Sequence, residues 1–254
     1  MISLFLLSFL FQSIKGGLVF TIVYNNVPYN ENLTTVWGFS CLIDLKDKNL
    51  LFDTGGDGSI LLDNMRKLKT DPKNINIVVL SHIHSDHTGG LWSFLEQNND
   101  VVVYLPASFP EDFKKRIRET GARFISVQTH TKIYENVYST GELGETRLKE
   151  QSLIIDTPKG LIVVTGCAHP GIVNIVKKAK ELLSKNIYLV LGGFHLMAYS
   201  EKEVKGIIKE LEELGVEKIA PSHCTGGRPI ELFREAWEEN FLDLGCGAVF
   251  EAGE

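Results

Sequence analysis

The sequence predicts a single domain of the α+β class, in which helices cover β-sheets. Short runs rich in β-branched residues alternate with amphipathic helical patterns along the chain. The chain has 254 residues, 44% of them hydrophobic, which is enough to form a substantial core. No Pro-rich, linker-like or repeated segment divides it. We therefore expect residues 18–254 to form one domain behind an N-terminal extension at residues 1–17.

The first half of the chain is predicted to be mostly strands. These are expected at 18–24, 36–45, 49–54, 75–81 and 101–106. Residues 46–49 (KDKN) form the predicted hairpin turn between the second and third strands. A helix is expected at 59–69 with Ser59 as its N-cap. A second helix is expected to begin near Gly89 and to continue through 91–98.

The second half repeats this alternation of strands and helices. Strands are expected at 123–128, 132–140, 152–157, 161–166, 187–193 and 217–222. Helices are expected at 171–185, 200–215 and 230–240. Ser200 followed by Glu203 predicts a capping box at the start of the second of these helices.

Composition restricts the class of partner. The formal net charge is −6, whereas a nucleic-acid-binding surface normally requires a basic patch. We therefore expect a small-molecule substrate and no nucleic acid. The four cysteines form no CxxC pair and suggest no disulfide framework, which favours a reducing, cytoplasmic location.

The apolar run at 2–11 (ISLFLLSFLF) does not fit an ordinary targeting signal. It is shorter than the roughly 20 residues that span a bilayer. It also lacks the preceding basic residue and the following cleavage site of a secretory signal. Three interpretations stay open: a packing segment that could serve a homodimer, an atypical membrane-targeting segment, or a start codon assigned too early. We expect no stable membrane span.

The clearest chemical signal is the segment 80–90 (LSHIHSDHTGG). Alternate residues of an extended segment point the same way, so His82 and His84 can face one point. The following turn can bring Asp86 and His87 to an adjacent point. Imidazole and carboxylate groups suit Zn²⁺, Fe²⁺ or Mn²⁺. A lone histidine after a strand is usually structural, but this spacing predicts a metal site, and the glycines at 89–90 permit a tight backbone behind it.

Three later histidines occur in one shared context. His169, His195 and His223 each follow a predicted strand and lie near glycine. Ligands commonly collect on the loops beyond one end of a sheet. Six of the seven histidines are thus candidates for one site, and His130 is predicted to be a surface loop residue.

Together these motifs resemble the metallo-β-lactamase superfamily, as does the strand 50–55 (LLFDTG). The resemblance implies an αββα four-layer sandwich, with two mixed β-sheets packed face to face and helices outside. It implies a binuclear site whose first metal is held by His82, His84 and His169. The second metal would be held by Asp86, His87 and His223, while Asp53 would buttress the metal loop.

One position departs from the family pattern. Most hydrolytic members have an Asp after the penultimate strand that bridges both metals, but here 191–196 (LGGFHL) carries His195. An imidazole has one lone pair per available nitrogen and bridges poorly. His195 could ligate one metal terminally, stay unligated and act as acid, base or phosphate contact, or be a packed loop residue. The second metal could also bind more weakly.

The later motifs narrow the resemblance to one branch. Segments 166–174 (GCAHPGIVN), 191–196 and 221–226 (PSHCTG) are similar to the branch named for dihydropterin–ribofuranosylaminobenzene phosphate synthase. That name describes a condensation in the biosynthesis of methanopterin-type cofactors. Branch membership does not establish that this chain performs the same reaction.

The resemblance implies a metal-dependent enzyme with two divalent ions, Zn²⁺ first and Fe, Mn or Mg as alternatives. We expect hydrolase-type chemistry on an anionic, phosphate-bearing small molecule, with Asp86 and His195 as catalytic residues. One alternative is a transferase that joins a dihydropterin methyl diphosphate to an aminobenzene ribofuranosyl phosphate. An alternative of another class is a non-catalytic metal-binding protein. A flavo-diiron oxidoreductase would need a carboxylate in place of His84 and a flavin domain.

Overall fold

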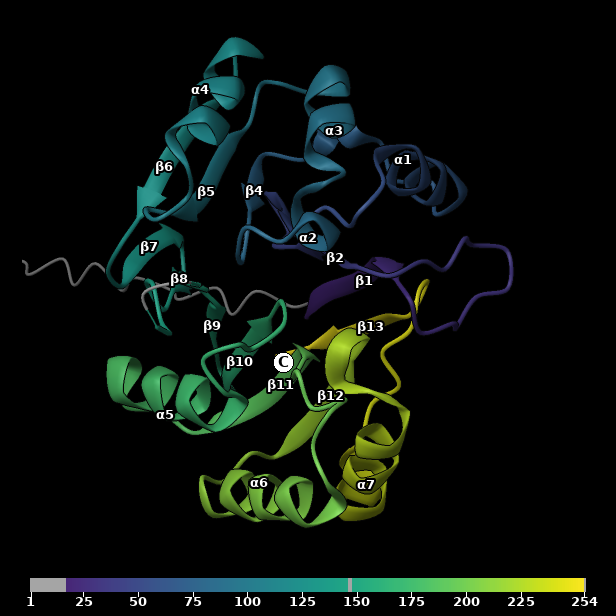
Figure 1. The fold of residues 1–254 in the computed structure, drawn as a ribbon, viewed down its shortest axis with the longest axis vertical. Helices are drawn as coiled ribbons and strands as arrows, with labels where there is room; N and C mark the ends of the chain where they lie inside the picture. Colours follow the sequence, from purple (N-terminus) through teal and green to yellow (C-terminus); the bar gives the residue numbers. More distant parts are fainter. Residues whose placement is uncertain (1–16, 146–147, 254) are drawn as a thin grey trace, which may run out of the picture.

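The computed structural model describes residues 17–145 and 148–253, so the apolar run at 2–11 lies outside the described residues. The described residues form two β-sheets packed face to face, and helices cover both outer faces (Figure 1). This arrangement is an αββα four-layer sandwich. The predicted fold class is therefore confirmed.

The first sheet is mixed and has seven strands. In spatial order they are β13 (Val249–Ala252), β1 (Leu18–Asn25), β2 (Phe39–Asp44), β3 (Asn49–Phe52), β4 (Ile77–Val79), β5 (Val102–Pro106) and β6 (Arg123–Val127). Pairing is antiparallel from β13 to β3 and parallel from β3 to β6. The hairpin predicted at 46–49 joins β2 to β3.

The second sheet is also mixed and has six strands. In spatial order they are β12 (Lys218–Ser222), β11 (Ile187–Gly193), β10 (Gly160–Thr165), β9 (Leu153–Thr157), β8 (Val137–Ser139) and β7 (Thr131–Tyr134). Strands β12, β11 and β10 are parallel, and the remaining pairs are antiparallel. Each sheet therefore contains a group of parallel strands whose C-terminal ends lie on the same side of the sheet.

The helices divide between the two outer faces, as Figure 1 shows. In the first half they are α1 (Gly58–Lys67), α2 (Ser85–Thr88), α3 (Leu91–Gln97) and α4 (Glu111–Glu119). In the second half they are α5 (Ile172–Leu183), α6 (Glu201–Glu213) and α7 (Gly227–Trp237). In the described part of the chain, none reaches the length and hydropathy needed to cross a bilayer. The homodimer and the cytoplasmic location stay predictions.

Alternation along the strands explains the layering. In β3, Leu50 and Phe52 enter the cluster between the sheets, whereas Leu51 packs under the helices of the first half. In β10, Ile162 enters the same central cluster and Leu161 packs against the helices of the second half. Both faces of these strands are apolar because both are covered. Each buried Leu, Ile or Phe contributes about 1.5–3 kcal/mol to the folded state.

Helix α2, helix α4 and strand β13 are among the elements that were not predicted. Helix α4 contains only Phe113 and Ile117 as its apolar positions, so its sequence is dominated by charge. Strand β13 pairs with β1 at the other end of the chain, and this long-range contact has no local signature.

The structure corrects three predictions about individual strands and helices. The segment 132–140 is not one strand but the hairpin of β7 and β8. Helix α1 is capped by Asp57 rather than Ser59, because the Asp57 carboxylate accepts the backbone N–H groups of Ser59 and Ile60. Helix α7 begins at Gly227 and ends at Trp237, instead of spanning 230–240.

The predicted capping box of α6 is confirmed and gives a stability prediction. Ser200 Oγ accepts the backbone N–H of Glu203 at 3.4 Å, and Glu203 Oε2 accepts the backbone N–H of Ser200 at 2.8 Å. Ser200→Ala should lower the free energy of unfolding by about 0.5–2 kcal/mol, measured by urea denaturation. Lys202→Ala, at an exposed position of the same helix, should stay within about 0.5 kcal/mol of the parent. Equal stability of the two variants would contradict the capping role.

Candidate metal centre

All the predicted site residues lie in the connections that follow strands with parallel partners, and Asp86 and His87 belong to the short helix α2. Asp53 follows β3, and the segment from His82 to His87 follows β4. On the other sheet, His169, His195 and His223 follow β10, β11 and β12. The parallel parts of both sheets thus supply the same site, which lies where their strands end.

Four non-glycine residues in these loops have left-handed backbone conformations. They are Asp53 (φ 57°), Ala168 (φ 61°), His195 (φ 55°) and His223 (φ 52°). Such conformations cost about 1–3 kcal/mol each and cluster at functional sites.

The first group of candidate ligands consists of His82, His84 and His169. One nitrogen of each ring lies within 4.8 Å of the corresponding nitrogens of the other two. The ring centroids are 4.7–4.9 Å apart. His82 is fully buried and His84 is exposed, so this group is enclosed on one side and open to solvent on the other.

The second group consists of Asp86, His87 and His223, together with Cys167. Asp86 Oδ2 lies 3.3 Å from His223 Nε2 and 3.6 Å from His87 Nε2. His87 Nε2 lies 3.2 Å from Cys167 Sγ. The structure therefore brings together both sets of candidate metal ligands that the family resemblance implies. It also adds the thiol of Cys167 to the second set.

Four of these histidines are oriented through Nδ1. The acceptors are Ser81 Oγ for His82 at 2.9 Å, Asp53 Oδ2 for His87 at 2.7 Å, Glu150 Oε2 for His169 at 2.9 Å, and Asn26 Oδ1 for His223 at 2.7 Å. A histidine that donates from Nδ1 carries its lone pair on Nε2. Hydrogen bonding of this kind is what orients metal-ligating histidines in proteins.

Two of the Nε2 atoms have no hydrogen-bond partner although they are buried: those of His82 and His223. Asp86 Oδ2 is close to His223 Nε2, but the pair lacks hydrogen-bond geometry. A buried polar atom without a partner costs about 1–3 kcal/mol. A divalent cation at each group would satisfy the unpaired nitrogen there, so the residues fit metals of the zinc type.

Protonation states agree with a ligand role. Burial lowers the pKa of His82 and of His87 to about 3, so both imidazoles are neutral at physiological pH. Burial opposes ionisation of Asp86, but its contacts with His223 and His87 outweigh this and hold its pKa well below the usual range. Neutral imidazoles and an ionised carboxylate are the forms that bind metal.

Asp53 lies directly behind the metal loop. It is fully buried and accepts hydrogen bonds from Ser81 N and Ser81 Oγ, both at 2.7 Å, in addition to its contact with His87. Burial raises its pKa to about 7. The close packing depends on glycine, because a Cβ at Gly166 would lie 2.1 Å from Ser81 Oγ and one at Gly90 would lie 2.0 Å from Thr54 O.

Glu150 is a site residue that sequence reasoning missed. Its Oε1 accepts the backbone N–H groups of Cys167 and Ala168, at 3.0 and 2.8 Å. Its Oε2 accepts both the backbone N–H and Nδ1–H of His169. It is buried, yet its contacts with His169 and His82 hold its pKa well below the usual range. Neither Glu150 nor Asn26 occurs in a recognisable motif, so no local signal could have found them.

His195 lies outside both groups. It belongs to a separate cluster with Cys167 and Cys224, and its ring centroid is 4.4 Å from that of His169. Its side chain is exposed, and a hydrogen bond with Cys224 raises its pKa. His130 is also exposed, as predicted, and stacks on Tyr138.

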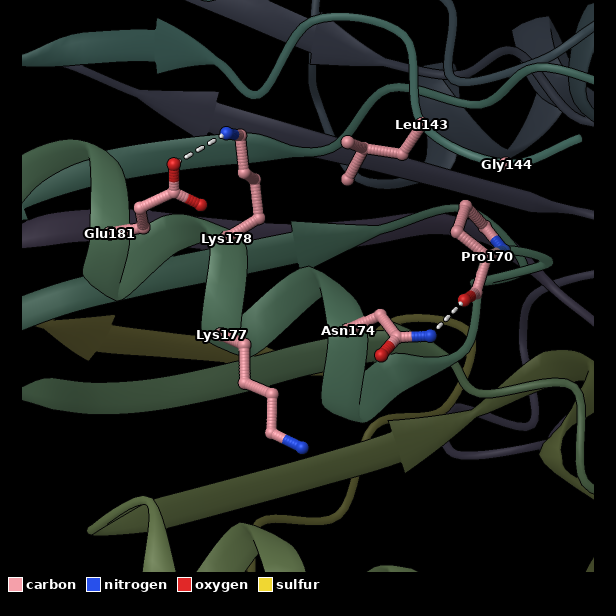
Figure 2. Close-up of a pocket in the computed structure, with 7 residues that line it drawn as sticks. All are labelled: Leu143, Gly144, Pro170, Asn174, Lys177, Lys178 and Glu181. Atoms are coloured by element: carbon pink, nitrogen blue, oxygen red, sulfur yellow. Dashed lines mark hydrogen bonds and ion pairs between the residues drawn. The ribbon is translucent and has the colours of Figure 1, made fainter.

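A surface pocket is lined in part by Pro170, the residue that follows His169 in the sequence (Figure 2). It is lined by Leu143, Gly144, Pro170, Asn174, Lys177, Lys178 and Glu181. Lys178 pairs with Glu181 and Lys177 pairs with Glu210. The pocket contains none of the predicted site residues, and its cations are already paired, so it offers no evident phosphate site.

Comparison of the sequence with known proteins identifies the same superfamily as the motifs do. The family model of the metallo-beta-lactamase superfamily matches residues 38–179, more than half of the chain. The chain is 29% identical to the 7,8-dihydropterin-6-methyl-4-(beta-D-ribofuranosyl)-aminobenzene-5'-phosphate synthase of Methanocaldococcus jannaschii, over 92% of this chain and 96% of that one.

Solved structures are similar over nearly the whole chain. Tm1679, described as a metal-dependent hydrolase of the beta-lactamase superfamily, is 29% identical with a TM-score of 0.77, covering 93% of this chain and all of that one. YhfI from Bacillus subtilis, a metallo-beta-lactamase fold protein, is 17% identical with a TM-score of 0.68, covering 94% of this chain and all of that one. The YhfI match supports the fold alone.

Proposed function

Because the chain is an enzyme of the metallo-beta-lactamase superfamily, we propose that it hydrolyses an anionic, phosphate-bearing small molecule at a binuclear metal site. One observation carries this proposal. Four histidines are held through Nδ1, so that their Nε2 atoms face two adjacent points. This arrangement orients lone pairs for metal ions, and a merely structural set of histidines would not need it.

The proposed ligand sets follow the two groups. The first metal would be held by His82, His84 and His169, and the second by Asp86, His87 and His223. Imidazole-rich sets suit Zn²⁺, with Fe²⁺ and Mn²⁺ as alternatives. Mg²⁺ fits less well because it prefers oxygen ligands.

The reaction would combine metal and side-chain chemistry. When bound, such a metal lowers the pKa of a coordinated water from about 15.7 to about 7 and polarises a phosphoryl oxygen. Asp86 directs Oδ2 toward His87 and His223, which leaves its other oxygen able to accept a proton from the nucleophile. His195 is exposed beside His169, where it could donate a proton to the leaving group.

His195→Ala tests this last role. Loss of a general acid should lower kcat by about 10²–10⁴-fold while leaving the metal content unchanged. Steady-state kinetics and inductively coupled plasma mass spectrometry measure the two quantities. Loss of one metal per chain would make His195 a ligand instead, and unchanged kinetics would leave it with neither role.

A second candidate function is the synthase reaction, which Trp37 favours. This side chain is 45% exposed, and its ring centroid lies 4.8 Å from that of His223. Met197, two residues after His195, is 56% exposed. Exposed apolar side chains beside a site suit a planar, partly apolar ligand such as a pterin or an aminobenzene. In this case the site would bind the diphosphate leaving group of a dihydropterin methyl diphosphate.

One set of assays separates the candidates. Protein loaded with zinc, manganese or iron would be tested with a generic phosphodiester, with a lactone, and with the two synthase substrates together. Metal-dependent phosphodiester turnover supports the hydrolase. Diphosphate release that requires the aminobenzene partner supports the synthase. Metal binding with no turnover of any of these substrates would contradict both.

A further inference from the structure

The second group has one more donor than the family resemblance implies. We propose that the thiolate of Cys167 is the fourth protein ligand of the metal held by Asp86, His87 and His223. The proposal rests on the proposed second metal and deepens it. It would add a protein donor to a metal that lacks the bridging carboxylate of the family pattern, because His195 stands at that position.

Three of the six distances between donor atoms are close to those around one tetrahedral ion. Zn–N and Zn–O bonds of about 2.0–2.1 Å and Zn–S bonds of about 2.3 Å place neighbouring donors ~3.3 Å apart for N and O, and ~3.5 Å apart for N and S. The distance is 3.3 Å between Asp86 Oδ2 and His223 Nε2, and 3.6 Å between Asp86 Oδ2 and His87 Nε2. It is 3.2 Å between His87 Nε2 and Cys167 Sγ. All four donor atoms lie within 4.8 Å of one another.

The donors are also oriented toward a common point. His87 Nδ1 is held by Asp53, so the lone pair on Nε2 faces Cys167 Sγ. His223 Nε2 is buried and has no hydrogen-bond partner. The backbone N–H of Cys167 is held by Glu150 Oε1, which fixes the start of its side chain. A cation among these atoms would satisfy the unpaired nitrogen and the thiolate together.

A competing arrangement places Cys167 with His195 and Cys224. That cluster offers three donors rather than four, and His195 in it is exposed. Contact with Cys224 and burial raise the pKa of the Cys167 thiol in the absence of metal. A coordinating divalent cation deprotonates a thiol outright, so this contact does not oppose ligation. The second group is therefore the better site.

The proposal predicts different metal preferences for the two positions. A thiolate donor favours Zn²⁺ and similar soft or borderline ions over Mg²⁺ and Mn²⁺. The first group, which consists of three imidazoles, lacks this preference. The second position should therefore discriminate against manganese more strongly than the first.

Cobalt substitution tests the assignment directly. The purified full chain would be titrated with Co²⁺ to two equivalents while its near-ultraviolet absorption is recorded. A sulfur-to-cobalt charge-transfer band is expected with the parent chain. It should disappear in Cys167→Ser and persist in Cys224→Ser, which removes the neighbouring buried thiol. Loss of the band in Cys224→Ser alone would overturn the proposal.

X-ray absorption of the zinc-loaded parent provides a readout that needs no variant, in case Cys167→Ser does not fold. A sulfur neighbour at about 2.3 Å from zinc is expected. Two metals per chain without any sulfur neighbour would overturn the role of Cys167 and leave the binuclear proposal standing. One metal per chain, ligated only by nitrogen and oxygen, would contradict the binuclear proposal as well.

Discussion

His84→Ala is expected to lose the first metal and the activity. His84 supplies one of only three imidazoles in the first group, with its ring 4.7 Å from His82 and 4.9 Å from His169. Loss of an outer-sphere partner already weakens metal binding by about 10–100-fold, and loss of a direct ligand should cost more. Metal content per chain by mass spectrometry and turnover in the assays above measure the effect.

His130→Ala is the matched control. His130 is exposed, its Nδ1 lies 3.0 Å from Ser139 O, and it lies outside both groups. Its removal should change neither metal content nor activity. A His84→Ala variant as metal-rich and active as His130→Ala would refute the site hypothesis.

Glu150→Gln is expected to weaken both stability and metal binding. The carboxylate accepts four hydrogen bonds, two at each oxygen. An amide has only one oxygen, so its NH₂ group would face either the backbone N–H groups of Cys167 and Ala168 or those of His169, where Nδ1 could change from donor to acceptor. At about 1–3 kcal/mol for each unsatisfied donor, the free energy of unfolding should fall by on the order of 1–6 kcal/mol. The affinity of the first group for its metal should fall by about 10–100-fold, because His169 loses the carboxylate that orients its ring.

Denaturant unfolding and competitive zinc titration measure these two effects. Glu142→Gln is the control, because Glu142 accepts a single backbone N–H, from Ser108, at an exposed position. It should leave zinc affinity unchanged. Equal zinc affinity in the two variants would mean that Glu150 supports the fold without orienting His169.

The repeating features of the molecule could be predicted from the sequence. Short apolar runs such as 161–166 identified the strands, because burial on both faces of a sheet leaves a continuous apolar run. The spacing of His82, His84, Asp86 and His87 predicted the candidate metal loop, and the structure brings these side chains into two groups that could each hold a metal ion.

Contacts between distant segments could not be predicted in this way. Glu150 contacts His169 from a different loop, and Asn26 reaches His223 across 197 residues of sequence. The approach of Cys167 to His87 joins segments that lie 80 residues apart in the sequence and has no local signature either. The left-handed conformation of His195 and His223 also has no sequence signature, because neither residue is glycine.

The candidate site takes its residues from the strand ends of both sheets, and this has a mechanical consequence. The first group takes His82 and His84 from the loop after β4, and His169 from the loop after β10. The second group likewise joins Asp86 to His223. Each bound ion would therefore act as a cross-link between the two halves of the sandwich. Because separation of the halves would break both sets of bonds, ions that bind only the folded state would resist that opening.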